Sequence, residues 1–202
     1  MDQRIQQTIN SLKENLFTVY YAENKKEALE KAKELLPKSG KVAFGGSESI
    51  KEIGLLDFIL SQPSLDIPNQ AEKGISMDEN FERRRLGLLS DMYLSSTNAV
   101  TISGELVNVD GTGNRVAALI WGPRNVLLIV GKNKIVDSIE GGYKRIKEVA
   151  APKNIVRLKK VAESHGKKRN PTVDSISNMF THIKRDRNRR ITIILVNEDL
   201  GY

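Results

Sequence analysis

The residues best suited to chemistry lie in two glycine-rich stretches and one short polar turn. The longest stretch, GELVNVDGTGNRVAAL at residues 104–119, interrupts an apolar run with glycines, an Asp, an Asn and an Arg. Gly111 and Gly113 allow the backbone to turn sharply, and Asn114 and Arg115 follow them directly. Because a guanidinium offers a planar fork of donors to a carboxylate or phosphate, this stretch predicts the rim of a ligand-binding site.

Two carboxylates of the same stretch suggest proton transfer. Asp110 stands at the expected end of a strand, and Glu105 lies five residues before it, across or near a hairpin. A carboxyl group whose pKa is raised by burial can act as a general acid or base beside a second carboxylate. The alternative is structural: a glycine-rich turn in which Asp110 accepts hydrogen bonds from backbone N–H groups and pairs with Arg115. The density of special residues favours the catalytic interpretation.

The second stretch, FGGSES at residues 44–49, has the pattern of a strand, two glycines, a hydroxyl and a helix start. Backbone N–H groups at Gly45 and Gly46, with the Ser47 hydroxyl, can bind an anion in such a turn. The pattern is neither a Walker loop nor GxGxxG, so it does not indicate a nucleotide specifically. The alternative is an ordinary turn in which Ser47 is the helix N-cap.

A third polar turn, KNK at residues 132–134, follows the apolar run NVLLIVG. Asn133 and Lys134 are therefore expected at the carboxyl end of a strand, as ligand contacts or as a helix-start loop. The run of arginines at 83–85 adds further cations. Since neighbouring side chains of a helix point in different directions, we expect one arginine over the sheet or site and the others in solvent.

Hydrophobic periodicity indicates the elements that hold these residues. Short apolar runs alternate with helical patterns, which argues for a mostly parallel sheet with helices on both faces. Ligands of such folds bind at the carboxyl ends of the strands. We expect helices at 2–17, 25–36, 47–60, 78–90 and 134–152, the last one stopped by Pro152; strands at 18–22, 41–46, 91–97, 125–131, 176–185 and 190–200; and a hairpin over 98–111.

Composition excludes several classes of site. The chain has 202 residues, no cysteine and two histidines, which excludes disulfides and cysteine-bound iron–sulfur clusters and leaves carboxylates as the remaining ligands for Mg²⁺. We therefore expect no cofactor and no metal centre. The sequence has neither an apolar run that would span a bilayer nor a signal-peptide core, which predicts a cytoplasmic protein without membrane insertion.

The net charge of +7 is concentrated near the end of the chain. Residues 153–190 contain twelve Lys or Arg and three Asp or Glu, with poor periodicity, and are expected to be rich in loops. Such a segment attracts phosphates or an acidic partner, or is simply solvated. Contact of Lys167, Lys168 and Arg169 with nucleic acid is the weakest hypothesis, because no module that reads bases is present.

Four segments resemble the LUD-domain family of lactate-utilisation proteins, once described as a domain of unknown function. They cover most of residues 1–157 and 190–202, and the central one is a continuous match. The segments are GGSESIKEIGL, FERRRLGLLSDMYLSSTNAVTISGELVNVDGTGNRVAALIWGPRNVLLIVGKNKIV, KRIKEVAAPKN and ITIILVNEDLGY.

The resemblance implies one LUD domain over residues 1–202, with an N-terminal helix at 1–17, the basic segment at 153–190 and a final strand at 191–202. It implies a Rossmann-like open α/β sheet similar to ribose-5-phosphate isomerase, glucosamine-6-phosphate deaminase and the CoA transferases, and related to 5-formyltetrahydrofolate cyclo-ligase. Many short members carry a cysteine cluster before the last strand. Here Ser177 stands near one of those cysteine positions, so a role tied to that cluster cannot operate in this chain.

The resemblance also implies action with iron–sulfur partner subunits in the oxidation of L-lactate to pyruvate. We expect the chain to bind a small anionic metabolite, with Gly45–Ser47 holding the anion, Arg115 and Lys134 neutralising charge, and Asp110 or Glu105 transferring a proton. The alternatives are a stand-alone isomerase or transferase for a sugar phosphate or acyl-CoA, and a non-catalytic scaffold. A homo-oligomer is compatible with each of these hypotheses.

Overall fold

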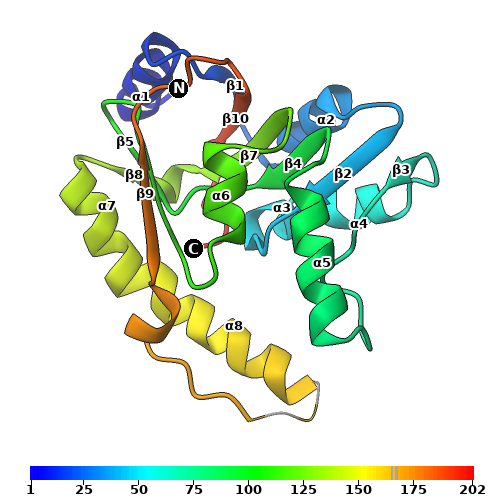
Figure 1. Ribbon diagram of the computed structural model, residues 1–202. Coiled ribbons are helices and arrows are strands. Elements are labelled where there is room, and N and C mark those ends of the chain that lie inside the picture. Colours follow the sequence, from blue (N-terminus) through cyan, green and yellow to red (C-terminus); the bar gives the residue numbers. More distant parts are fainter. Residues whose placement is uncertain (165, 167) are drawn as a thin grey trace.

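The computed structural model describes residues 1–164, 166 and 168–202, and Figure 1 shows their arrangement. Lys167, expected above to contact phosphates, lies outside the described residues. A large sheet of six strands, all parallel, forms the centre of the fold. Its strands in spatial order are β1 (Thr18–Ala22), β10 (Ile191–Val196), β7 (Asn125–Gly131), β4 (Met92–Ser95), β2 (Gly40–Phe44) and β3 (Leu65–Asp66).

The central strands are apolar on both faces, as expected for a buried parallel sheet. Successive side chains of a strand point to opposite faces, so β7 contributes Leu128 to one core and Leu127 to the other. Strand β10 divides Ile193 and Ile194 in the same way. The Rossmann-like open α/β sheet predicted from the sequence is confirmed.

Helices cover both faces of the large sheet. One core includes side chains of α1 and α6 and is bordered by the end of α5, and the other includes side chains of α2, α3 and α4. These helices are α1 (Gln3–Glu14), α5 (Met77–Gly87), α6 (Asn114–Ile120), α2 (Lys25–Leu35), α3 (Glu48–Glu52) and α4 (Leu55–Leu60). The single helix expected over 47–60 is two helices, because Gly54 adopts a left-handed φ of 79° between them.

A second sheet of four strands contains the predicted hairpin. Strands β5 and β6 pair antiparallel, β6 also pairs antiparallel with β9, and β8 pairs with β5. The strands are β8 (Ile135–Val136), β5 (Ala99–Thr101), β6 (Leu106–Asp110) and β9 (Met179–Ile183). Only three residues separate β4 from β5, so the small sheet begins directly at the carboxyl edge of the large one.

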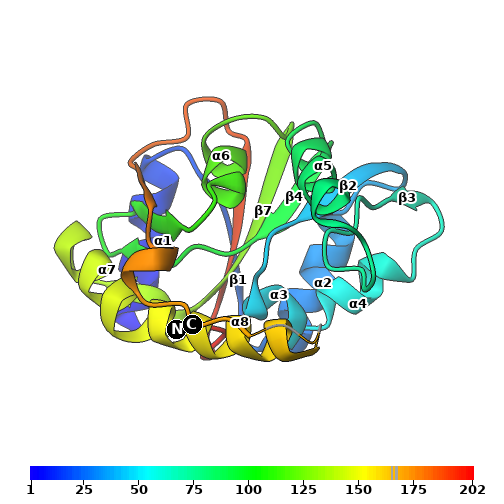
Figure 2. The ribbon, with the colours of Figure 1, turned by 60° about the horizontal axis from the view of Figure 1, so that its bottom comes forward.

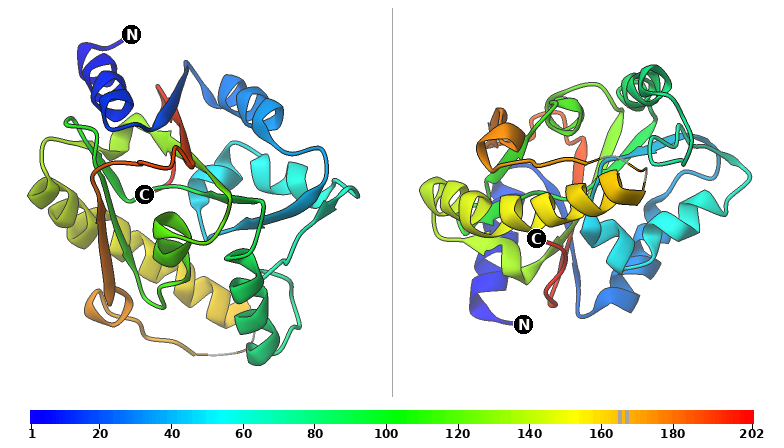
Figure 3. Two further views of the ribbon diagram at one scale, coloured as in Figure 1. Left: turned by 45° about the horizontal axis from the view of Figure 1, so that its top comes forward. Right: turned by 90° about the horizontal axis from the view of Figure 1, so that it is seen from below.

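Two predictions about the segment after β8 are wrong. The helix does not stop at Pro152, because α7 (Ile139–Arg145), a turn of π-helix η2 (Ile146–Ala150) and α8 (Ala151–Ser164) are consecutive. Proline is tolerated there because it stands in the first turn of α8, where the lost N–H costs least. The basic segment is therefore helical up to Ser164. This helical rod runs across the end of the large sheet near which the C-terminus lies (Figures 2 and 3).

The final strand is shorter than predicted. Strand β10 ends at Val196, and the residues after it form no regular structure. Asn133 holds them, since its Oδ1 accepts from the N–H of Leu200 at 3.1 Å. Among the residues that the structure describes, no helix is both long and apolar enough to cross a membrane.

Candidate functional site

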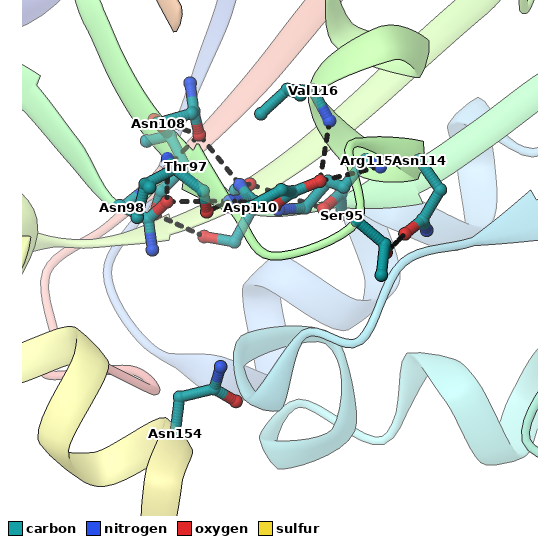
Figure 4. Close-up of polar contacts among 12 residues, drawn as sticks. Ser95, Thr97, Asn98, Asn108, Asp110, Asn114, Arg115, Val116 and Asn154 are labelled. Carbon is teal, nitrogen blue, oxygen red and sulfur yellow. Dashed lines mark hydrogen bonds and ion pairs between the residues drawn. The ribbon is translucent and has the colours of Figure 1, made fainter. Parts of the chain in front are cut away.

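Asp110 and Arg115 form the centre of a polar network at the start of α6 (Figure 4). The Asp110 carboxylate accepts from the backbone N–H groups of Arg115 and Val116 at 2.8 and 2.9 Å. It also accepts from Arg115 Nε at 2.9 Å. A carboxylate at a helix N-terminus satisfies free N–H groups and meets the positive end of the helix dipole.

The Arg115 guanidinium uses its donors within the protein. Its two terminal nitrogens donate to the side-chain oxygens of Asn108 and Asn98, at 2.8 and 2.7 Å, and to the backbone oxygens of Ser96 and Val109. A guanidinium has five N–H donors. The four hydrogen bonds of the terminal nitrogens and the one from Nε to Asp110 use all five. The predicted role of Arg115 in neutralising a ligand therefore has no free donor to act through. Instead, Arg115 joins the end of β4 to β6.

Glu105 and Asp110 do not form the predicted carboxylate pair. They flank opposite ends of β6, and five residues of strand span about 17 Å. Glu105 lies near His182 of β9, with 3.4 Å between Oε2 and Nε2. An extended strand rises more than about 3 Å per residue, so two carboxylates that are five residues apart in sequence lie far apart in space. The alternative interpretation of Asp110, as an acceptor for the backbone and a partner of Arg115, matches the contacts.

The loop from Gly45 to Ser47 differs from the predicted anion-binding turn. The N–H of Gly45 donates to the oxygen of Leu94, continuing the pairing with β4, and the N–H of Ser47 donates to the oxygen of Gly45. The Ser47 hydroxyl caps α3 by accepting from Ile50 at 3.4 Å. These groups are thus engaged, and Ser47 is the helix N-cap that the alternative interpretation expected.

The loop nevertheless borders the polar network. A Cβ placed on Gly45 would lie 3.4 Å from Cδ of Arg115 and 3.1 Å from the hydroxyl of Tyr93. A Cβ on Gly46 would lie 3.6 Å from the Arg157 guanidinium. The two glycines therefore allow arginines from α6 and α8 to approach the end of β2.

The remaining glycines and Asn114 shape the turn before α6. Gly113 has a φ of 87°, a conformation that favours glycine, and a Cβ there would overlap Sδ of Met179. Gly111 packs against the backbone of Ile176. Asn114 accepts from the Thr112 hydroxyl at 2.8 Å. This turn is thus built against the segment that leads into β9.

Lys134 lies deepest of the predicted residues, with 2% of its surface exposed. Its Nζ is 2.9 Å from both Ser49 Oγ and Ser96 Oγ. Burial, with the charges of Arg145 and Arg115, lowers the pKa of Lys134 to about 7, and Glu52 acts in the opposite direction. Asn133, the other predicted contact of this turn, holds the residues after β10.

Three more residues complete the candidate site: Arg84, from the run of arginines of which one was expected over the sheet or site, and Tyr202 and Arg157, which the sequence did not indicate. Arg84 is the arginine of α5 that turns toward it: Nη1 donates to Thr112 at 3.2 Å, and Nε is buried without a hydrogen-bond partner in the described part of the chain. Burial lowers the pKa of Arg84, the charges of Tyr93 and Asp110 oppose this shift, and the charges of Arg157 and Arg169 add to it. The Tyr202 hydroxyl is buried beside Arg157, which lowers the pKa of Tyr202 while burial raises it more strongly.

Arg157 comes from α8, where its guanidinium contacts Asn154 at 2.7 Å and lies 3.9 Å from Glu48. Asn154 lies apart from the Asp110 network in Figure 4, on the helix that crosses the sheet edge. Only the docking of α8 brings Arg157 to Gly46, and no local pattern encodes that docking. The described residues contain no group of three His, Cys, Asp or Glu side chains able to hold a metal ion.

Comparison with known proteins assigns the family. The model of the LUD domain matches residues 5–196. The chain belongs to the LUD-domain family. It is thus a lactate-utilisation-type protein in the general sense of that family. A search of the curated proteins found no match.

A solved structure supports the fold of this LUD-domain chain. A DUF162 family protein from Deinococcus radiodurans is similar over 96% of this chain and 97% of its own, with a TM-score of 0.55. Its sequence identity is 14%, so the likeness concerns the fold alone.

Proposed function

We propose that this LUD-domain protein binds a small metabolite carrying a carboxylate or phosphate at the carboxyl edge of the large sheet. The observation that carries the proposal is the Arg84 Nε group, which is buried without an acceptor among the described residues, close to Asp110 and to the cations Arg157 and Arg169. A buried donor left unpaired costs free energy, and an anion would satisfy it. The buried hydroxyl of Tyr202 lies beside Arg157 and adds a second polar group that can donate to the anion.

Neighbouring groups support the same proposal. Arg115 has its charge balanced by Asp110, whereas Arg84 makes no ion pair among the described residues. Gly46 leaves space in front of the Arg157 guanidinium. We assign anion binding to Arg84, Arg157 and Tyr202, and assign to Asp110 and Arg115 the positioning of the loops around them.

Binding to anionic probes tests the proposal. We expect one or more of lactate, pyruvate, inorganic phosphate and ribose 5-phosphate to raise the melting temperature, because a ligand of the native state stabilises it. Arg84→Ala should weaken that binding roughly tenfold or more, the value of a hydrogen bond to a charged group. Arg85→Ala is the matched control, since Arg85 is an exposed residue of the same helix paired with Glu82.

The two variants separate a specific site from general charge attraction. Equal loss of binding in both variants, or undiminished binding in Arg84→Ala, would overturn the assignment. The identity of the stabilising probe distinguishes a hydroxy or keto acid from a sugar phosphate, the ligand of an isomerase-like or transferase-like enzyme.

We also propose that the protein contributes to the oxidation of L-lactate to pyruvate together with partner subunits. An exposed apolar surface supports contact with another protein. Leu89 and Trp121 are 77% and 71% exposed, and Ile120 lies beside them in a depression lined mainly by apolar side chains. This surface, formed by Leu88, Leu89, Ala117, Ile120, Trp121 and Gly122, is called the α5–α6 surface below.

A further inference from the structure

The Lys134 amine is held by two serine hydroxyls that both accept from it. Ser49 Oγ and Ser96 Oγ lie 2.9 Å from Nζ. Each hydroxyl donates its own proton to a backbone oxygen: Ser49 to Leu200 at 3.4 Å, and Ser96 to Thr97 at 3.3 Å. The serines therefore present lone pairs to Lys134, and the amine supplies the hydrogen atoms.

The number of acceptors fits an uncharged amine. An ammonium group has three N–H donors, and the described residues offer Lys134 two acceptors. A buried third donor would remain unpaired, at a cost in free energy. A neutral amine has two N–H donors, which the two serines satisfy, and its lone pair stays unengaged. Burial and the charges of Arg145 and Arg115, which lower the pKa of Lys134, favour the same form.

The direction of these hydrogen bonds disfavours a serine nucleophile activated by lysine. In such a pair the hydroxyl donates to the amine, which removes its proton. Here each hydroxyl has a backbone oxygen of its own as an acceptor, at 3.4 Å for Ser49 and 3.3 Å for Ser96. The group with a free lone pair is the amine itself.

We propose that Lys134 is a nucleophilic amine that forms an imine with the carbonyl carbon of an aldehyde or keto anion bound at the carboxyl edge. The nitrogen–carbon bond forms as the carbon–oxygen double bond opens, and the carbonyl oxygen then leaves as water with the two amine hydrogens. No oxidant or reductant takes part, and hydrolysis reverses the step. This inference rests on the proposed function, because the anionic part of the ligand is bound by Arg84 and Arg157.

Access to the amine requires movement of the chain above it. Leu200 lies against Ser49, and Gly201 donates to the Glu52 carboxylate at 2.8 Å. A Cβ on Gly201 would lie 2.7 Å from Ser49 Oγ, so this backbone covers the serine closely. Small carbonyl compounds are therefore the appropriate probes.

Reductive trapping tests the proposal. The full chain is incubated with pyruvate or glycolaldehyde phosphate and cyanoborohydride, which reduces imines to stable amines, and the labelled peptides are mapped by mass spectrometry. We expect Lys134 to be modified at pH 7 at least tenfold faster than the exposed Lys132. Lys134→Arg should remove that label, and Lys132→Arg should retain it. Absence of label on Lys134, or equal labelling of Lys132, would overturn the proposal.

Two further arms separate this inference from the proposed function. Uncharged glycolaldehyde should label Lys134 at least tenfold more slowly than glycolaldehyde phosphate, and Arg84→Ala should remove the difference. Thermal stabilisation by anions without trapping would refute the imine and leave anion binding intact. If the labelling rate of Lys134 depends on neither the phosphate of the probe nor Arg84, the nucleophilic role of Lys134 stands and the anion site is refuted.

Discussion

At the scale of residues, the carboxyl edge contains two basic side chains, of which only one has its charge compensated by a carboxylate. Arg115 is paired with Asp110 and donates five hydrogen bonds within the protein, so its charge is compensated. Lys134 makes no ion pair with any residue that the structure describes and contacts two neutral hydroxyls. Because an uncompensated buried charge is costly, burial lowers the pKa of Lys134.

Protonation of Lys134 makes stability depend on pH. Its pKa is about 7 in the folded chain, through burial and the facing charges of Arg145 and Arg115, with Glu52 opposing, whereas the ordinary pKa of a lysine is 10.5. Between these values the unfolded chain binds a proton that the folded chain does not, so stability rises with pH. The expected slope is roughly 1 kcal/mol per pH unit above that of Lys134→Met, which lacks the group.

Urea unfolding of both proteins at pH 7.5, 8.5 and 9.5 measures this difference. The other titrating groups are common to the two proteins and cancel in the comparison. Parallel stability curves would show that Lys134 keeps an ordinary pKa in the folded chain. That result would also remove one support for its nucleophilic form.

At the scale of elements, the sequence predicted those whose pattern is local. The apolar runs of β7 and β10 and the alternation of β5 and β6 identified strands correctly. Errors arose where a neighbour decides the outcome: Pro152 is the second residue of α8, which continues directly from η2, and Glu105 is separated from Asp110 by the length of β6. The same difference between local patterns and distant contacts applies to the residues of the candidate site. Lys134 was predicted from its strand end, whereas Arg157 reaches the site only through the docking of α8.

The turn between β5 and β6 provides a test of packing between elements. Gly104 has a φ of 77°, and a Cβ there would lie 2.4 Å from the backbone of Ser11 in α1. Gly74 has a similar φ of 85° with nothing within 4 Å. Gly104→Ala should therefore cost backbone strain plus a steric clash, about 3 kcal/mol or more, and Gly74→Ala only the strain of about 1 kcal/mol.

Chemical denaturation of the two variants gives both values. Their difference isolates the contact of α1 with the hairpin, since the left-handed backbone conformation is common to both positions. Equal destabilisation would mean that α1 moves away without cost, and would contradict close packing at this turn.

At the scale of the whole molecule, charge and apolar surface lie at opposite ends of the large sheet. Lys134 and Gly45 follow the carboxyl ends of β7 and β2, where α8 adds Arg157. The residues of the α5–α6 surface instead come just before β4 and β7 in the sequence, so this surface lies at the amino edge of the sheet. Figure 2 shows α8 along the end of the sheet near which the C-terminus lies. A partner bound to the α5–α6 surface would therefore leave the carboxyl edge free for a ligand.

This separation predicts that partner contact and ligand binding can be removed independently. Replacing Leu89 and Trp121 together by Ser should reduce co-purification of iron–sulfur subunits from native cells several-fold, because tryptophan side chains such as Trp121 are among the residues that carry most of the binding energy at protein interfaces. Phe81→Ser is the control, since Phe81 is an exposed residue of α5 outside the surface. Thermal stabilisation by anions should be unchanged in both proteins. Undiminished recovery with the double variant would refute the partner assignment, and a wild-type dimer that this variant converts to monomer would assign the surface to a second copy of the chain.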